Sequence, residues 1–233
     1  MVETRKVEEK MAGLFSTKRP FSAHLFKWED PLLPDKYDHN CFEYSGQPSR
    51  EELEEAMRYQ RSIGSAFIKL EGDEPLLDSF GLEQSITLTM VLRSAGQGWK
   101  TNPELVFHVP SLSELEDIER RHFGPLYGED FTRRNIRRLY EKLTFHGAYL
   151  DGKLVGAGYS FSDSGFTCID GLIVDAAYRK RCVATSLIKH IKESCPDTIL
   201  FLHADDDDTP KDMYLKMGFE ISDRLYEYFS PLH

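Results

Sequence analysis

The sequence predicts a mixed α/β (α+β) fold with a mostly antiparallel sheet flanked by helices. Asp151-Gly152 is a strong turn signal between two apolar segments, residues 145–150 and 153–162, and a third strand-like segment follows at 166–174. These three segments form an antiparallel meander. Helices and strands alternate after it, with helices expected at 182–193 and 209–217 and strands at 198–203 and 219–229.

Length and composition agree with a globular protein. The chain has 233 residues, of which 40% are hydrophobic and 29% are charged. Lys and Arg number 29 and Asp and Glu 39, so the net charge is −10. The electrostatic field of a protein with this net negative charge repels nucleic acid and anionic membranes, and it favours cationic substrates, such as amines. We expect no partner of either excluded class.

The sequence also bears on location and metal content. No apolar run reaches the roughly 18 residues of a membrane span, and Met1–Gly13 lacks the apolar segment of a signal peptide. The four cysteines form neither a CxxC pair nor a zinc-binding spacing: Cys41, Cys168, Cys182 and Cys195. We therefore expect free thiols, a cytoplasmic location and no metal site.

The N-terminal part reads as a smaller α/β accessory domain over residues 21–98. Residues 1–20 are charged and lack periodicity, so we expect a mobile lead-in there. Ser49 and Glu52 form a capping box that begins a helix reaching about Ile63. Strands are expected at 66–70 and 86–92, and the loop residues 94–98 are the best linker candidate.

A larger C-terminal domain is expected over residues 103–233. A strand at 105–109 precedes a helix that Ser111 or Ser113 caps and that ends at Gly124-Pro125. An amphipathic helix follows at 131–143. Near the C-terminus, Thr209 and Pro210 begin a short helix that Gly218 ends.

A weak internal repeat relates the two parts. Helix 50–63 with strands 66–70 and 86–92 follows the same order as helix 182–193 with the strands near 198–203 and 225–229. This order is common in α/β chains, so coincidence and duplication are both open.

The segment 169–181 predicts an anion-binding turn. A strand ends at Val174, a short loop with Arg179, Lys180 and Arg181 follows, and a helix opens near Cys182. The amides of a first helical turn and the helix dipole attract anions, and the three cations strengthen that field. The alternative is a solvated basic turn without a ligand.

At these residues the sequence resembles the GNAT superfamily of acyl-CoA N-acyltransferases. The family's loop signature stands here as Arg179-x-x-Cys182-x-Ala184, with Cys182 where the family usually has Gly. A second family block stands as Tyr214-Leu-Lys-Met-Gly218-Phe219. The resemblance covers somewhat over half the chain, from about Leu105 to Phe229, and it makes the N-terminal part an accessory domain or a degenerate GNAT-like copy.

The resemblance implies a coenzyme A site with acetyl-CoA as co-substrate. Positive charge would come from Arg179, Lys180 and Arg181. The backbone of Leu172, Ile173 and Val174 would pair with the pantetheine arm. The pyrophosphate would bind the amides of Arg181, Cys182, Val183, Ala184 and Thr185.

Two residues are candidates for catalysis. Tyr214 is the candidate general acid, since a phenol with pKa ≈ 10 can protonate a thiolate, whose thiol has pKa ≈ 8.5. Its alternative role is core packing. Asp170 is the candidate general base, since a carboxylate is unusual on an otherwise apolar strand, and the alternative is an outward-facing residue. Cys182 is a candidate low-pKa thiol or a plain packed thiol.

The implied activity is transfer of an acetyl group from acetyl-CoA to a primary amine of a small molecule or peptide. A second hypothesis is a catalytically silent acyl-CoA sensor or scaffold, and a third is a protein-interaction module that keeps only the fold. Turnover with a panel of amines separates the first two, and coenzyme A binding separates both from the third. The acceptor and the oligomeric state stay open.

Overall fold

The structure is a computed structural model that describes residues 2–93, 98–208 and 210–232. Its helices are α1 (Val2–Ala12), η1 (Tyr37–His39), α2 (Arg50–Ser62), α3 (Leu112–Tyr127), α4 (Glu129–Tyr140), η2 (Ala176–Tyr178), α5 (Val183–Ser194) and α6 (Pro210–Lys216). Its strands are β1 (Thr17–Pro20), β2 (Leu25–Glu29), β3 (Phe42–Tyr44), β4 (Phe67–Gly72), β5 (Glu83–Leu92), β6 (Val106–His108), β7 (Thr144–Leu150), β8 (Lys153–Asp163), β9 (Phe166–Val174), β10 (Ile199–Asp205) and β11 (Glu220–Pro231).

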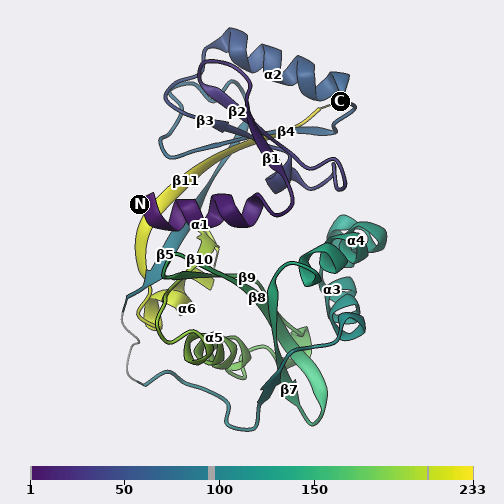
Figure 1. Cartoon of the computed structure of the whole chain (residues 1–233), viewed down its shortest axis with the longest axis vertical. Helices are drawn as coiled ribbons and strands as arrows, with labels where there is room; N and C mark the ends of the chain where they lie inside the picture. The colour runs from purple at the N-terminus through teal and green to yellow at the C-terminus, as the bar shows by residue number, and fades with distance from the viewer. Residues whose placement is uncertain (1, 94–97, 209, 233) are drawn as a thin grey trace. The chain divides into compact units, whose positions relative to one another are not determined.

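The chain divides into two compact units. Unit 1 comprises Met1–Val7, Met90–His203 and Asp212–Glu220, and unit 2 comprises Glu8–Thr89, Ala204–Lys211 and Ile221–His233. Among the described residues, eleven strands are hydrogen-bonded in the order β1-β2-β3-β4-β11-β5-β10-β9-β8-β7-β6 (Figure 1). β3 pairs with β4 and β9 with β10 in parallel, whereas β1–β2, β2–β3, β4–β11, β6–β7, β7–β8 and β8–β9 are antiparallel. The predicted mixed, mostly antiparallel fold is confirmed.

In unit 1, the hairpin β7–β8 turns at Asp151-Gly152, with φ of 51° and 75°, as the sequence predicts. Helix α5 packs on β7, β8 and β9 on one face of this part of the sheet, and α3, with α4 packed against it, lies on the other face (Figure 1). On the α4 face, the rings of Tyr140 and Phe145 lie 5.6 Å apart. On the α5 face, a Cβ atom at Gly156 would lie 2.7 Å from Val183, so the helix packs closely on β8.

The parallel pair β9–β10 opens towards the carboxyl end of β9. Its register runs from Phe166–Ile199 to Ile169–Leu202, and the last five residues of β9 lie beyond it. On its other side, β9 stays paired with β8 as far as Val174. This arrangement positions one edge of residues 170–174 next to the loop that leads into α5.

In unit 2, α2 connects the parallel strands β3 and β4. Ser49 and Glu52 form the predicted capping box, with the Glu52 amide donating to Ser49 Oγ and the Ser49 amide donating to Glu52. β11 pairs antiparallel with β4. The core cluster of this unit contains Leu25, Phe42, Tyr44, Leu53, Ala56, Ile68, Leu70, Leu82 and Tyr228.

The structure differs from the expectations at the N-terminus. Residues 1–20 were expected to be a mobile lead-in, but α1 and β1 lie there, and Val7 of α1 is buried. β1 pairs with β2 and Arg19 bonds Glu29 at 3.0 Å, so the ordering depends on partners ten residues away. The predicted domain limits at residues 98 and 103 stay a prediction, although residues 221–233 belong to unit 2.

Helix α3 ends later than the sequence predicts. α3 was expected to end at Gly124-Pro125 but continues to Tyr127, because a proline in the last turn removes little of the helical hydrogen bonding. It ends at Gly128, where φ is 87° and α4 begins directly. The predicted cap at Thr209 and most of the predicted linker 94–98 lie outside the described residues.

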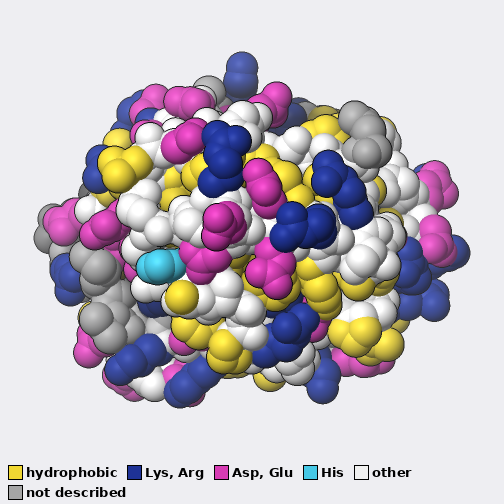
Figure 2. Space-filling view, turned by 90° about the horizontal axis from the view of Figure 1, so that it is seen from above, with side chains coloured by type: hydrophobic (Ala, Val, Ile, Leu, Met, Phe, Trp, Pro, Cys, Tyr) yellow, Lys and Arg dark blue, Asp and Glu magenta, His cyan; other side chains and the backbone are white. Residues whose placement is uncertain are grey.

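Figure 2 shows one face of the molecule, on which acidic and basic side chains are interspersed.

Candidate functional site

The turn between β9 and α5 is shaped by local hydrogen bonds. Asp175 follows β9 and accepts a bond from the amide of Ala177 at 3.1 Å, which caps the short helix η2. Beyond η2, Lys180 and Cys182 have φ of 62° and 58°, in the left-handed region. That region suits glycine, so Cys182 carries a side chain at a position whose backbone favours none.

The first turn of α5 presents backbone donors. Cys182 is the N-cap of α5, and its side chain makes no capping hydrogen bond. The amides of Val183, Ala184 and Thr185 have no acceptor within the helix, because the first turn of any α-helix lacks them. The N-terminus of α5 is therefore suited to an anion.

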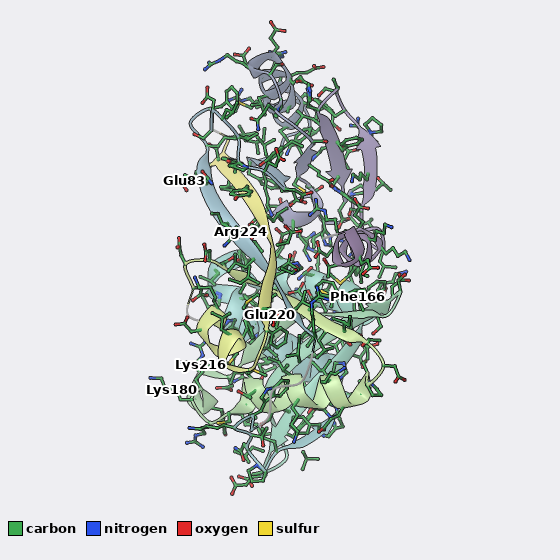
Figure 3. The ribbon with its side chains drawn as sticks, turned by 90° about the vertical axis from the view of Figure 1, so that its left-hand side faces the viewer. Glu83, Phe166, Lys180, Lys216, Glu220 and Arg224 are labelled. Carbon is green, nitrogen blue, oxygen red and sulfur yellow. The ribbon has the colours of Figure 1, made fainter. Side chains whose placement is uncertain are left out.

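Three cations surround this turn. Arg179, Lys180 and Arg181 are all exposed, and Lys180 is labelled in Figure 3. The Arg181 guanidinium lies 5.5 Å from the ring centre of Tyr178, and Arg179 lies 3.4 Å from Nδ1 of His122 on α3. Burial, and secondarily the charge of Arg179, lowers the pKa of His122 below its usual value.

Helix α3 holds the start of the turn through an ion pair that the sequence reasoning missed. Arg121 donates to Asp175 Oδ2, and Lys153 Nζ lies 3.5 Å from the same oxygen. Burial of Asp175 opposes ionisation, but the bond from Arg121 and the Ala177 amide outweigh it, so its pKa is lowered. Asp175 is therefore an ionised residue that anchors the turn. The sequence feature that could have identified it is its place directly after β9.

Asp170 lies at a bulge in β9. Tyr159 of β8 is opposite Asp170, and Ala157 is opposite Ile173, so β9 has one extra residue between these pairs. The extra residue makes Asp170 share a sheet face with Ile173 rather than with Leu172. Gly171 in the bulge has φ of 60°, and its amide donates to Asp170 Oδ1 at 2.6 Å.

Tyr159 contacts this carboxylate and was missed by the sequence reasoning. Its hydroxyl donates to Asp170 Oδ2 at 2.8 Å, while its side chain is 8% exposed and Asp170 is exposed. Burial, together with the charge of Asp170, raises the pKa of Tyr159 well above its usual value. No sequence signal relates the two residues, because their pairing depends on the register of β8 and β9.

Tyr214 lies on α6 in the same unit. Its side chain is 7% exposed, and its ring centre is 5.8 Å from that of Phe219. Its carbonyl accepts from the amides of Met217 and Phe219, each at 3.0 Å. This burial agrees with a packing role and leaves the general-acid role a prediction.

The structure brings most of the predicted residues together along one segment. Asp170 and the backbone of Leu172–Val174 lie on β9, and the predicted loop residues 179–185 follow directly, whereas Tyr214 comes from a separate helix. Within the described part of the chain, no three His, Cys, Asp or Glu side chains gather as metal ligands would. No helix in that part is both long and apolar enough to cross a membrane.

Comparison with known proteins relates this chain to one family. The sequence profile described as "Acetyltransferase (GNAT) family" matches residues 112–219. No curated protein sequence matches the chain.

Solved structures share the fold. A functionally unknown conserved protein from Staphylococcus epidermidis aligns with TM-score 0.79 and 15% identity, covering 94% of this chain and 95% of that one. A GCN5-related N-acetyltransferase from Kribbella flavida aligns with TM-score 0.69 and 12% identity, covering 100% and 96%. A tandem GNAT protein from the clavulanic acid biosynthesis pathway aligns with TM-score 0.55 and 15% identity, covering 78% and 69%.

The matched range begins at the first residue of α3 and ends just after α6, so it includes the open edge of β9, the basic turn and the N-terminus of α5. Residues 112–219 of this chain form an acetyltransferase domain of the GNAT family.

Proposed function

We propose that this chain is an acetyl-CoA-dependent N-acetyltransferase that acts on a primary amine of a small molecule or peptide. The observation that carries the proposal is the junction of β9 and α5. There, Arg179, Lys180 and Arg181 surround the N-terminus of α5, whose first-turn amides need acceptors. Beside it lies the edge of β9 that extends beyond the pairing with β10.

The residues of the junction fit acetyl-CoA. The amides of Arg181–Thr185 would bind the pyrophosphate, and the three cations would balance its charge. The backbone of Leu172–Val174 would pair with the pantetheine arm, as an added strand pairs with a sheet edge. The bound thioester supplies an acyl group whose carbonyl carbon an amine can attack.

Two side chains of the domain would carry out the proton transfers. As the amine nitrogen bonds to the carbonyl carbon, it must lose one proton, and the exposed carboxylate of Asp170 accepts it. As the carbon–sulfur bond breaks, the thiolate must gain a proton, and the Tyr214 hydroxyl donates it. The products are an amide and a free thiol, so atoms and charge balance.

The net charge of −10 supports a cationic amine as acceptor. It supports neither a nucleic acid nor an anionic membrane as partner. All four cysteines are free thiols, which agrees with the proposed cytoplasmic location.

The test combines binding and turnover. We expect calorimetry to find one coenzyme A per chain, and thiol release from acetyl-CoA to rise with at least one amine of a varied panel. Binding without amine-dependent thiol release would instead support a silent acyl-CoA sensor or scaffold. Absence of coenzyme A binding would refute the site and favour a protein-interaction module.

A further inference from the structure

The carboxylate of Asp170 is held by two donors from different parts of the bulge. The hydroxyl of Tyr159 donates to Oδ2 at 2.8 Å, and the amide of Gly171 donates to Oδ1 at 2.6 Å. Each oxygen thus has one fixed donor, and an ionised carboxylate has about four acceptor sites, so positions remain for a transferred proton. A carboxylate held at both oxygens has one orientation.

The glycine at position 171 of β9 leaves room for the ring of Tyr159. A Cβ atom at Gly171 would lie 2.3 Å from Cε1 of Tyr159, so the ring occupies the space that only glycine leaves open. The φ of 60° at Gly171 is a second reason for glycine there. The ring also packs against Phe145, with ring centres 5.4 Å apart. The hydroxyl is therefore presented to Asp170 by a rigid, buried ring.

We propose that Tyr159 is a positioning residue that orients the carboxylate of Asp170 for proton transfer from the acceptor amine. The inference rests on the proposed function, because it takes Asp170 as the general base. Tyr159 touches no substrate in this scheme and acts through Asp170 alone. Its raised pKa keeps the hydroxyl protonated, so it stays a donor under assay conditions.

A double-mutant cycle tests the proposal. Tyr159→Phe removes only the hydroxyl, and we expect kcat to fall roughly 10-fold, with KM for acetyl-CoA and the melting temperature almost unchanged. Asp170→Asn should lower kcat further, and the double variant should equal Asp170→Asn alone, because Tyr159 then has no base to orient. Wild-type kcat in Tyr159→Phe, or additive losses in the double variant, would overturn the proposal.

Tyr149→Phe is the matched control. Tyr149 is also a buried tyrosine of this domain, and its hydroxyl donates to a carboxylate, Glu114 Oε2, at 3.2 Å. Because that pair lies away from β9, we expect its loss to leave kcat unchanged. An equal fall in kcat for both tyrosine variants would show a general packing effect and overturn the positioning role.

A second readout does not depend on turnover. In protein labelled with ¹³C at tyrosine Cζ, the Tyr159 resonance should shift in Asp170→Ala and stay in place in Glu114→Ala. An unmoved resonance would overturn the contact itself. A chain that binds coenzyme A but acetylates no amine would refute the proposed function and the positioning role together, whereas an active chain with additive losses would refute only the role of Tyr159.

Discussion

Both units contain a helix that connects two parallel strands, but the N-termini of the two helices have opposite chemistry. In unit 2, the N-terminus of α2 is closed by the protein's own carboxylate. Glu52 accepts from the Ser49 amide at 2.8 Å, from Ser22 Oγ at 2.6 Å and from the His24 amide at 3.0 Å. Burial opposes ionisation, yet these bonds lower the pKa of Glu52 to about 2.

In unit 1, the N-terminus of α5 has no such closure. Cys182 makes no side-chain capping bond, and the residues around it are cations instead of carboxylates. Topology alone therefore does not make an anion site. A helix N-terminus is available to a phosphate only where the chain leaves its amides unsatisfied and its field positive.

The two helices also belong to the weak internal repeat. The order of helix and two strands is present in both halves, as α2, β4, β5 and as α5, β10, β11. The halves differ between the strands, where the second has α6 and residues 73–82 of the first form no helix. Parallel strand–helix–strand units are common in α/β proteins, so duplication and coincidence both stay open.

The largest effect is expected when the Tyr214 hydroxyl is removed in unit 1, compared with removal of a buried tyrosine hydroxyl in unit 2. If Tyr214 protonates the leaving thiolate, Tyr214→Phe should fold normally, keep its affinity for acetyl-CoA and lose roughly 10²–10⁴ in kcat. The control is Tyr228→Phe in unit 2, which removes the acceptor of the Leu76 amide. It should cost about 1 kcal/mol of stability without changing kcat. Wild-type turnover in Tyr214→Phe would leave Tyr214 a packing residue.

The closed N-terminus of α2 should give a pH signature. The pKa of Glu52 is about 2 when folded, against an ordinary 4.5, so the unfolded state binds more protons at low pH. Its stabilisation is therefore complete above pH 4.5 and is lost as the pH falls through about 2. After screening by solvent, we expect Glu52 to account for roughly 1–3 kcal/mol of the stability lost between pH 7 and 2, measured as the difference between wild type and Glu52→Gln in urea unfolding.

Glu52→Gln should remove most of this pH dependence. Glu51→Gln, in the same helical turn, is the control and should change the free energy of unfolding by less than about 0.5 kcal/mol. Equal pH profiles for the Glu52 variant and the wild type would contradict the closed-terminus interpretation.

Charge reversal should affect only the open terminus. Arg179→Glu combined with Arg181→Glu should weaken coenzyme A binding by at least about 1–3 kcal/mol in calorimetry, because charge-assisted bonds to phosphate are lost. Arg50→Glu, at the first residue of α2, should leave that affinity unchanged. Unchanged affinity in the Arg179→Glu, Arg181→Glu variant, or binding of two coenzyme A per chain, would refute the proposed difference between the N-termini of α5 and α2.

The smallest effect concerns the backbone of the loop. Cys182 has φ of 58°, which costs a non-glycine residue energy, so Cys182→Gly should stabilise the fold by about 0.5–1 kcal/mol. The reverse control is Gly64→Ala after α2, where φ is 72° and the loss should be about 1 kcal/mol. A lower melting temperature for Cys182→Gly would contradict the predicted relief of strain.

The elements that sequence reasoning predicted well depend on neighbouring residues. The hairpin at Asp151-Gly152 and the caps at Ser49 and Ser111 use bonds or dihedral preferences within a few residues, so their patterns are visible in the chain. The basic turn before α5 is local for the same reason. β1, β2 and β3 escaped prediction, because strands of three to five residues have little periodicity and depend on pairing with one another.

Local patterning therefore decides where helices and turns form and which helix N-terminus carries cations, because side chain and backbone interact there over three or four residues. Tertiary structure decides which side chains meet. The bond between Tyr159 and Asp170 depends on one extra residue in β9, and a shift of one residue moves every side chain to the other face. The opening of β9 from β10 likewise depends on where these two strands stop pairing, and their paired residues lie 33 positions apart in the chain.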